Sequence, residues 1–292
     1  NIDLLICEGS LCTFVGIFYK IKNPNTFLIS YIIDPAFWIK VKSKFSFRLI
    51  LRSFLHRLIV NHTVCITDMV REDGIKYNFI KNKEKSSIVP LHSPIEKPYS
   101  IRPYQERSYS NSRQISLIYI IDRPVDTAYT KGLDIVIRIC DELFSRKINF
   151  KLDIYGFGTE NLNFSKPWLN KNGYSRELFK AYENADLFLL PSRYDAISIA
   201  SIEAISHGLI PLVSNKVGSK EFLTNRFSSE IDLVNEVNNI PDWVETINTI
   251  ANLENNKKDE IIADLLRNIE HINLDNIVKS FNNLIYEKLR IN

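Results

Sequence analysis

The sequence predicts an α/β fold built from two doubly wound domains. Apolar runs typical of buried strands begin near residues 115, 150, 186 and 209, and segments with helical spacing lie between most of them. Such alternation indicates parallel strands joined by right-handed crossovers. Because the runs are almost continuously apolar, we expect a sheet that is covered on both faces. The first hundred residues show a weaker form of the same pattern.

Each element of the second half is predicted from its own pattern of apolar residues. In chain order, the predictions are a strand at Ile115–Ile121, a helix at Leu133–Phe144, a strand at Phe150–Tyr155, a helix at Arg176–Asn184, a strand at Asp186–Leu190, a helix at Ile199–His207 and a strand at Leu209–Ser214. Sheets of this type bind ligands at the carboxyl ends of their strands. We therefore expect the chemistry in the loops that follow these four strands.

The first half and the ends of the chain set the domain boundaries. Strand candidates are Leu4–Cys7, Phe27–Ile32, Val64–Thr67 and Ile88–Leu91, with helices at Leu11–Lys20 and Lys44–Val60. Residues 94–113 contain three prolines and few apolar residues, which is typical of a linker. We expect an N-terminal domain at 1–100, a linker at 101–114, a second domain at 115–275 and a closing helix at 276–292. Because the chain opens at Asn1 within a strand-like segment, we expect the N-terminal domain to be incomplete.

Composition restricts the classes of protein that the chain can belong to. The net charge of +3 over 292 residues is too small to argue for nucleic-acid binding. No apolar run is long enough to span a membrane, and no signal peptide is visible, so we expect a cytoplasmic protein. The histidines and cysteines lack metal-ligand spacing, and we expect no metal or other cofactor. The cysteines are expected to be buried free thiols: Cys7, Cys12, Cys65 and Cys140.

Two carboxylates eight positions apart form the strongest cluster in the sequence. Asp195 falls in the loop after a predicted strand, and Glu203 lies about one turn into the next helix. The backbone amides of Ser198, Ile199 and Ala200 would be free donors at that helix start. Free amides and the helix dipole attract an anion, and ionised carboxylates accept hydrogen bonds from sugar hydroxyls. Either acid alone is more simply a surface charge.

A second cluster supplies two cations at the same sheet edge. Arg123 follows the first strand of the second domain, and Lys131, followed by Gly132, is expected to open the next helix. Two fixed cations there could neutralise a diphosphate. Each would be an ordinary surface charge without this context.

At these residues the chain resembles the retaining GT-B glycosyltransferases of group 1, also called family four. The matching positions are Asp122-Arg123, Lys131-Gly132, Pro191-Ser192, Asp195, Glu203-Ala204, Gly208, Pro211, Val217-Gly218 with Glu221, and the closing stretch Phe281–Leu289. The resemblance implies a two-domain GT-B fold with a cleft between the domains, a donor site in the second domain and an acceptor on the side of the first.

The resemblance also implies a role for each matched residue. Arg123 and Lys131 would bind the donor diphosphate and stabilise the leaving nucleotide, with Asp195 holding hydroxyls of the donor sugar. The remaining implied roles are backbone amides of Ser198 and Ile199 on the phosphates, Glu203 on the ribose, Gly156 and Gly158 near the base, and Asp34 on the acceptor side. The chain departs from the family pattern where Asp195 replaces a glutamate and Asp122 replaces a glycine. These departures bear on which donor the protein uses more than on its fold.

A basic segment in the first half suggests a further partner. Residues 35–67 contain no acid, and Lys44, Arg48, Arg52 and His56 recur every four positions. A basic amphipathic helix beside aromatic residues can lie on an anionic membrane, and a solvated helix face explains the stripe equally well.

We therefore expect a hexosyltransferase that uses a UDP- or GDP-sugar and a glycan or lipid-linked acceptor in cell-surface polysaccharide synthesis. It would be cytoplasmic or peripheral on the inner face of the membrane. A non-catalytic nucleotide-sugar-binding protein, or a truncated inactive relative, is the main alternative, and an epimerase of similar fold is a weaker one.

Overall fold

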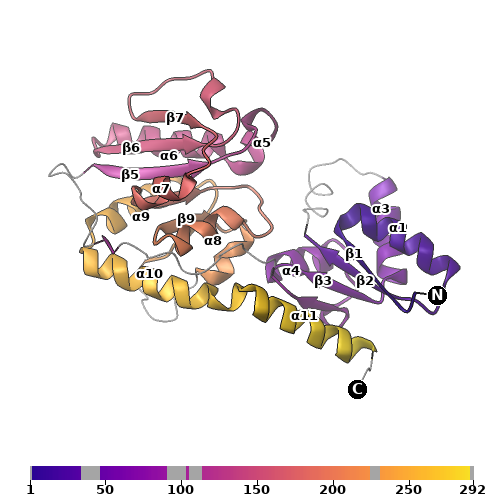
Figure 1. Cartoon of the computed structure of the whole chain (residues 1–292). Coiled ribbons are helices and arrows are strands. Elements are labelled where there is room, and N and C mark those ends of the chain that lie inside the picture. Colours follow the sequence, from indigo (N-terminus) through magenta and orange to yellow (C-terminus); the bar gives the residue numbers. More distant parts are fainter. Residues whose placement is uncertain (1, 34–46, 91–102, 105–113, 224–230, 290–292) are drawn as a thin grey trace. The chain divides into compact units, whose positions relative to one another are not determined.

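The computed structural model describes residues 2–33, 47–90, 103–104, 114–223 and 231–289. The chain divides into two compact units (Figure 1). Unit 1 comprises Asn1–His92 and His271–Asn292, and unit 2 comprises Ser93–Glu270. Asp34, Lys44 and most of the expected linker at 101–114 lie outside the described residues.

Unit 1 is a parallel sheet with helices between its strands. The sheet has the order β1 (Leu4–Glu8), β2 (Phe27–Ile32), β3 (His62–Cys65) and β4 (Ser86–Ile88). The helices α1 (Gly9–Lys22), α3 (Phe47–Ile59) and α4 (Asp68–Lys76) separate these strands. The predicted α/β class is therefore confirmed for the first half of the chain.

The final helix of the chain belongs to unit 1. Leu28 packs with Cys7 and Ile17 of the α1 side, whereas Ile29 packs with Leu284 of α11 (Leu274–Leu289). Since neighbouring strand residues point to opposite faces, α1 and α11 cover the two faces of the sheet. The helix that the sequence shows as a closing segment thus completes the core of the first unit.

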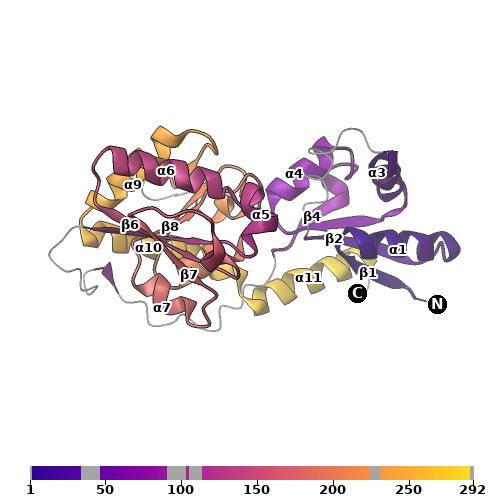
Figure 2. The same cartoon turned by 90° about the horizontal axis from the view of Figure 1, so that it is seen from above.

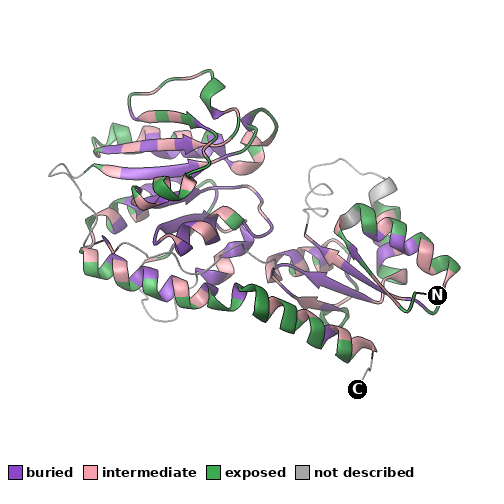
Figure 3. Ribbon diagram, in the orientation of Figure 1, coloured by how far each residue is buried: buried purple, intermediate pink, exposed green. Residues whose placement is uncertain are grey.

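Unit 2 is a larger parallel sheet. Among the described residues its strands are β5 (Ile115–Ile120), β6 (Phe150–Tyr155), β7 (Leu169–Gly173), β8 (Leu187–Leu190), β9 (Ile210–Ser214) and β10 (Val234–Asn235), in the order β10-β9-β8-β5-β6-β7. Strands β8 and β9 are buried along their whole length (Figure 3). The chain builds outward from β5 in one direction and from β8 in the other, so the topological switch point lies between these two strands.

Helices cover both faces of this sheet. They are α5 (Pro124–Lys131), α6 (Leu133–Ser145), α7 (Leu178–Glu183), α8 (Ile199–Ser206), α9 (Ile240–Asn252) and α10 (Asn255–Ile269). Helix α6 packs against α9, and α8 packs against α10. Figure 2 shows α6 and α9 on one side of the sheet and α7 on the other.

The structure corrects two local predictions. Lys131 ends α5 instead of opening a helix, and Gly132, at φ 76°, separates α5 from α6. Cys7, Cys65 and Cys140 are buried free thiols as predicted, but Cys12 is exposed on α1. Within the described ranges, no helix combines the length and the apolar character that crossing a bilayer requires.

Candidate functional site

The candidate site lies at the carboxyl edge of the unit 2 sheet, at its switch point. Loops after β5, β6 and β8 approach one another there so closely that glycine is required. A Cβ on Gly132 would lie 2.1 Å from the carbonyl oxygen of Pro191, and one on Gly156 would lie 1.9 Å from that of Ile121. These contacts are far below any ordinary van der Waals distance. The two glycines thus fix the loop backbones that carry the predicted residues.

Asp195 joins Lys131 to the start of α8. The Lys131 Nζ atom lies 2.6 Å from Asp195 Oδ2, and Asp195 Oδ1 accepts a hydrogen bond of 3.1 Å from the Ser198 backbone N–H. Backbone bonds hold the aspartate itself, because its N–H donates to Lys216 and its carbonyl accepts from Gly218. The structure therefore brings three predicted residues together: Lys131, Asp195 and Ser198.

The start of α8 differs from the expectation in one respect. The Ser198 amide donates to Asp195, so it is not a free donor. Ser198 adopts a left-handed conformation at φ 48°, and its hydroxyl accepts from the Ser201 N–H. Within the described residues, the N–H groups of Ile199 and Ala200 donate no hydrogen bond. Two first-turn amides therefore remain for an anion, supported by the helix dipole.

Arg123 stands at the carboxyl end of β5 with an exposed side chain. Its backbone is left-handed at φ 48°, which is uncommon for a residue other than glycine. The Arg123 N–H donates to the carbonyl of Phe157, and its Nε lies 3.3 Å from Oδ2 of Asp122. The guanidinium thus pairs with its own neighbour, whereas Lys131 pairs across the loops. Non-glycine residues held in this conformation occur preferentially at functional sites.

Glu203 is half-buried in the second turn of α8. Burial raises the pKa of its carboxyl group, and a hydrogen bond from the Tyr182 hydroxyl opposes that shift. The Tyr182 ring in turn stacks on His207, with ring centroids 5.5 Å apart. The carboxylate therefore has a partner on α7.

The predicted glycine turn after β6 has a structural role. Gly156 and Gly158 have φ values of 132° and 89°. The turn that they form brings the Phe157 carbonyl to Arg123, and Gly156 lies against Ile121. These observations explain why glycine is needed, and they leave the expected contact with a nucleotide base as a prediction.

Arg193 is a residue of this site that the sequence reasoning missed. Its Nη1 and Nη2 atoms donate to the two carboxylate oxygens of Asp134 at 2.7 Å each, and Nη1 also donates to the Tyr129 carbonyl. Its guanidinium lies 4.1 Å from the centre of the Tyr129 ring. The same contacts lower the pKa of Asp134, chiefly through the hydrogen bonds from Arg193. Arg193 thus fastens the loop after β8 to α5 and α6. The Pro191-Ser192-Arg193 run was the available signal.

The fold and the site together define a class of protein. Two parallel α/β sheets, of which the larger has a polar cluster at its switch point, make this a protein of the GT-B fold. Residues 126–268 match the family model described as glycosyl transferases group 1.

Similar proteins support both statements. A glycogen synthase of Desulfitobacterium hafniense is 30% identical over 127 residues, which is 40% of this chain and 26% of the relative. The chain thus spans about a quarter of that enzyme's length. A sucrose-phosphate synthase from Thermosynechococcus elongatus matches with a TM-score of 0.72 at 14% identity, over 99% of this chain and 74% of the other. Anabaena HepE, solved in complex with UDP-glucose, matches with a TM-score of 0.67 at 13% identity, over 98% of this chain and 79% of that one.

Proposed function

We propose that this protein transfers a hexose from a UDP- or GDP-sugar to an acceptor and retains the anomeric configuration. The observation that carries the proposal is the Lys131–Asp195–Ser198 arrangement beside the unpaired amides of α8, at the switch point of unit 2. Ligands of open parallel sheets bind at such a point. The match of residues 126–268 to the group 1 family model and the UDP-glucose bound by HepE support a nucleotide-sugar donor.

The donor diphosphate would lie at the amino end of α8. The N–H groups of Ile199 and Ala200 would bind its oxygens, and the Lys131 ammonium would neutralise its charge. The exposed guanidinium of Arg123 would leave Asp122 for the stronger charge of the diphosphate. Fixed donors that face the departing nucleotide stabilise the charge that develops on it, which is the main source of rate acceleration here.

The carboxylates would orient the sugar and the ribose. Each Asp195 oxygen already accepts one hydrogen bond and keeps further lone pairs for hydroxyls of the donor sugar. Glu203 would bind the ribose hydroxyls, and Gly156 and Gly158 would lie near the base. The acceptor would be a glycan or a lipid-linked sugar in cell-surface polysaccharide synthesis, and the exposed apolar side chains of α1 and α3 favour the lipid-linked one.

Nucleotide binding tests the site. We expect Arg123→Ala and Glu203→Ala to weaken UDP or GDP binding at least about fivefold in calorimetry, because each removes a charge-assisted contact. Arg146→Ala is the matched control, since Arg146 is an exposed residue paired with Glu142 at the far end of α6. Unchanged affinity in both site variants would refute the assignment. Nucleotide binding without donor hydrolysis or transfer would favour the non-catalytic alternative.

The membrane partner is proposed from a different surface than the basic stripe. His56 is buried and Arg52 lies over the Phe14 ring, so neither belongs to an open basic face, and the side chains of Lys44 and Arg48 lie outside the described residues. The exposed residues are apolar: Leu11, Val15, Phe18 and Ile21 on α1, and Ile50, Leu51, Phe54 and Leu58 on α3.

The charge of this region favours an anionic lipid surface as the occupant. Helices α1 and α3 pack together, and residues 9–67 contain eight lysine and arginine residues but one acid. Exposed apolar side chains on a segment rich in lysine and arginine bind anionic bilayers. In sedimentation with anionic and neutral vesicles, the wild type should bind the anionic ones preferentially, and Phe18→Ser/Phe54→Ser should lose the difference. Equal sedimentation of the wild type with both vesicle types would exclude this partner.

A further inference from the structure

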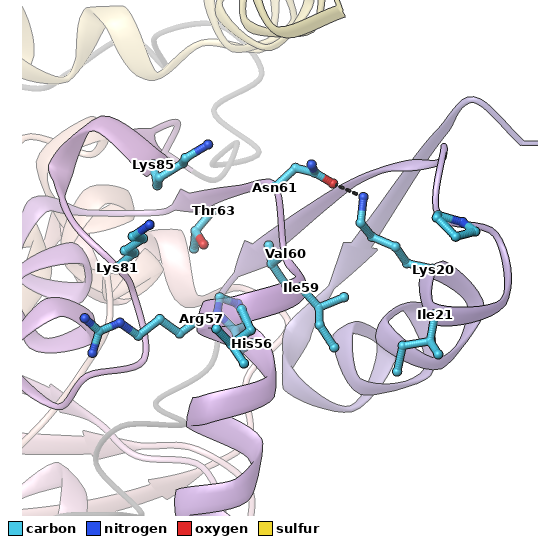
Figure 4. Close-up of a pocket in the computed structure, with 12 residues that line it drawn as sticks. Lys20, Ile21, His56, Arg57, Ile59, Val60, Asn61, Thr63, Lys81 and Lys85 are labelled. Atoms are coloured by element: carbon cyan, nitrogen blue, oxygen red, sulfur yellow. Dashed lines mark hydrogen bonds between the residues drawn. The ribbon is translucent and has the colours of Figure 1, made fainter.

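Unit 1 contains a pocket at the amino ends of its own strands. The candidate site of unit 2, by contrast, lies at the carboxyl ends of the strands of the other sheet. The pocket has a volume of about 430 Å³ and is lined by the ends of α1 and α3 and by the segments that lead into β3 and β4 (Figure 4). Its lining includes four cationic residues and no acidic one: Lys20, Arg57, Lys81 and Lys85. A cavity lined by one sign of charge concentrates the opposite sign.

Two of these cations are available to a ligand. Lys81 and Lys85 are exposed, and neither side-chain ammonium group has a hydrogen bond or an ion pair within the described part of the chain. Lys20 is held in place by hydrogen bonds of 2.6 Å to the Thr26 carbonyl and 2.5 Å to Asn61 Oδ1. An ammonium has three N–H donors, so one donor of Lys20 remains. Figure 4 shows Lys81 and Lys85 on one side of Thr63 and Lys20 on the other.

His56 adds a buried acceptor to the lining. It is 2% exposed, and its Nδ1 lies 2.9 Å from the Phe79 carbonyl oxygen. Because a carbonyl only accepts, Nδ1 carries the proton and the neutral ring presents Nε2 as an acceptor. Nε2 is buried and has no hydrogen-bond partner among the described residues. A buried polar atom of this kind is rare unless something hydrogen-bonds to it.

We propose that this pocket binds a small phosphorylated molecule that carries hydroxyl groups. The ammonium groups of Lys81, Lys85 and Lys20 bind the phosphoryl oxygens, and a ligand hydroxyl donates to Nε2 of His56. Sulfate has no hydroxyl hydrogen to donate at neutral pH and contacts the cations alone, so the histidine distinguishes a sugar phosphate from sulfate. The site lies within unit 1 and does not depend on the donor site of unit 2.

Calorimetry in a buffer free of phosphate and sulfate tests the proposal, with glucose 6-phosphate and sulfate as probes. The wild type should bind glucose 6-phosphate more tightly than sulfate. Lys81→Met/Lys85→Met should raise the Kd for glucose 6-phosphate at least about tenfold, because two charge-assisted contacts are lost. Lys279→Met, at an exposed lysine of α11 outside the pocket, is the control and should keep the wild-type Kd.

Two further measurements place the ligand. Lys131→Met removes one of the two cations of the unit 2 site and should leave glucose 6-phosphate binding unchanged. In side-chain nitrogen NMR, glucose 6-phosphate should shift the His56 Nε2 resonance. The proposal is overturned if the wild type does not bind at millimolar ligand, if the lysine double variant keeps its Kd, if Lys131→Met abolishes binding, or if the His56 signal does not move.

Discussion

Asp195 acts on two elements at once through its two carboxylate oxygens. One oxygen pairs with Lys131 at the end of α5, and the other accepts from Ser198 before α8. The Asp195 side chain is 14% exposed, compared with 34% for Lys131. Exposed ion pairs contribute little to stability because water and salt screen them, whereas a partly buried pair with an added backbone bond is screened less.

A double-mutant cycle measures this pair. Lys131→Met and Asp195→Asn should show a coupling energy of about 1 kcal/mol in urea unfolding. The exposed Arg146–Glu142 pair on α6 is the control and should couple by about 0.3–0.5 kcal/mol. A coupling at Lys131–Asp195 no larger than this control would show that the pair is a surface contact only.

At the scale of the element, close backbone contacts hold the site loops together. Gly132 ends α5 in a left-handed conformation and leaves no room for a side chain beneath Pro191. Gly158 is also left-handed, but a Cβ there would meet only the Pro124 ring, at an ordinary 3.5 Å. Gly158 is therefore required only for its left-handed backbone, whereas Gly132 is required both for its left-handed backbone and for its close contact with Pro191.

Alanine substitution tests that separation. Gly158→Ala should cost about 1–2 kcal/mol through its left-handed backbone alone. Gly132→Ala should cost roughly 1–3 kcal/mol more, because the loop after β8 must move. Urea unfolding followed by the fluorescence of Trp168 and Trp243, both in unit 2, in a Trp38→Phe background measures both. Equal costs would contradict the close contact between Gly132 and Pro191.

For the whole molecule, acid sensitivity should be concentrated in unit 1. Burial lowers the pKa of His56 to about 3 and that of His62 to about 4. The unfolded chain takes up protons on these residues near pH 6.5, while the folded chain keeps them neutral. The free energy of unfolding of unit 1 is therefore fully present above pH 6.5 and is lost as the pH falls toward the folded pKa values.

Hydrogen exchange of peptides from β2 and β3 measures this dependence. Their protection should fall between pH 6.5 and pH 4 by up to roughly 1.4 kcal/mol per pH unit for each histidine. His62→Gln should flatten part of the slope, and His271→Gln, at an exposed histidine, should leave it unchanged. Protection that stays constant over this range would show that neither histidine resists protonation.

The apolar pattern of the sequence is sufficient to predict the fold. It does not predict elements that contain few apolar residues and are held by hydrogen bonds to their neighbours. The buried strands β5, β6, β8 and β9 follow from their apolar runs. By contrast, β7 (LNKNG) and α4 contain few apolar residues. Strand β7 is held by its register with β6. Helix α4 begins where the Thr67 hydroxyl accepts from the Val70 N–H, a cap that Thr67-Asp68 signals only weakly.

The sequence predicted which residues form the site but not how they pair. Lys131 and Asp195 are 64 positions apart, and their contact depends on side-chain conformation and on the turn at Gly132. The role of Ser198 differs from the predicted one, because its backbone N–H donates to Asp195 and is not free for an anion. Arg193 was overlooked because its partners, Asp134 and Tyr129, lie on helices that only the fold brings close.

The placement of α11 has a consequence for synthesis on the ribosome. Residues 93–270 are inserted between the two stretches that make up unit 1. Ile29 and Val64 therefore lack their Leu284 contact until translation has passed position 284, by which time every strand of unit 2 has been made. Since domains fold as units during synthesis, unit 2 completes its fold before unit 1. A nascent chain that stops before residue 274 therefore exposes one face of the unit 1 sheet, to which chaperones can bind.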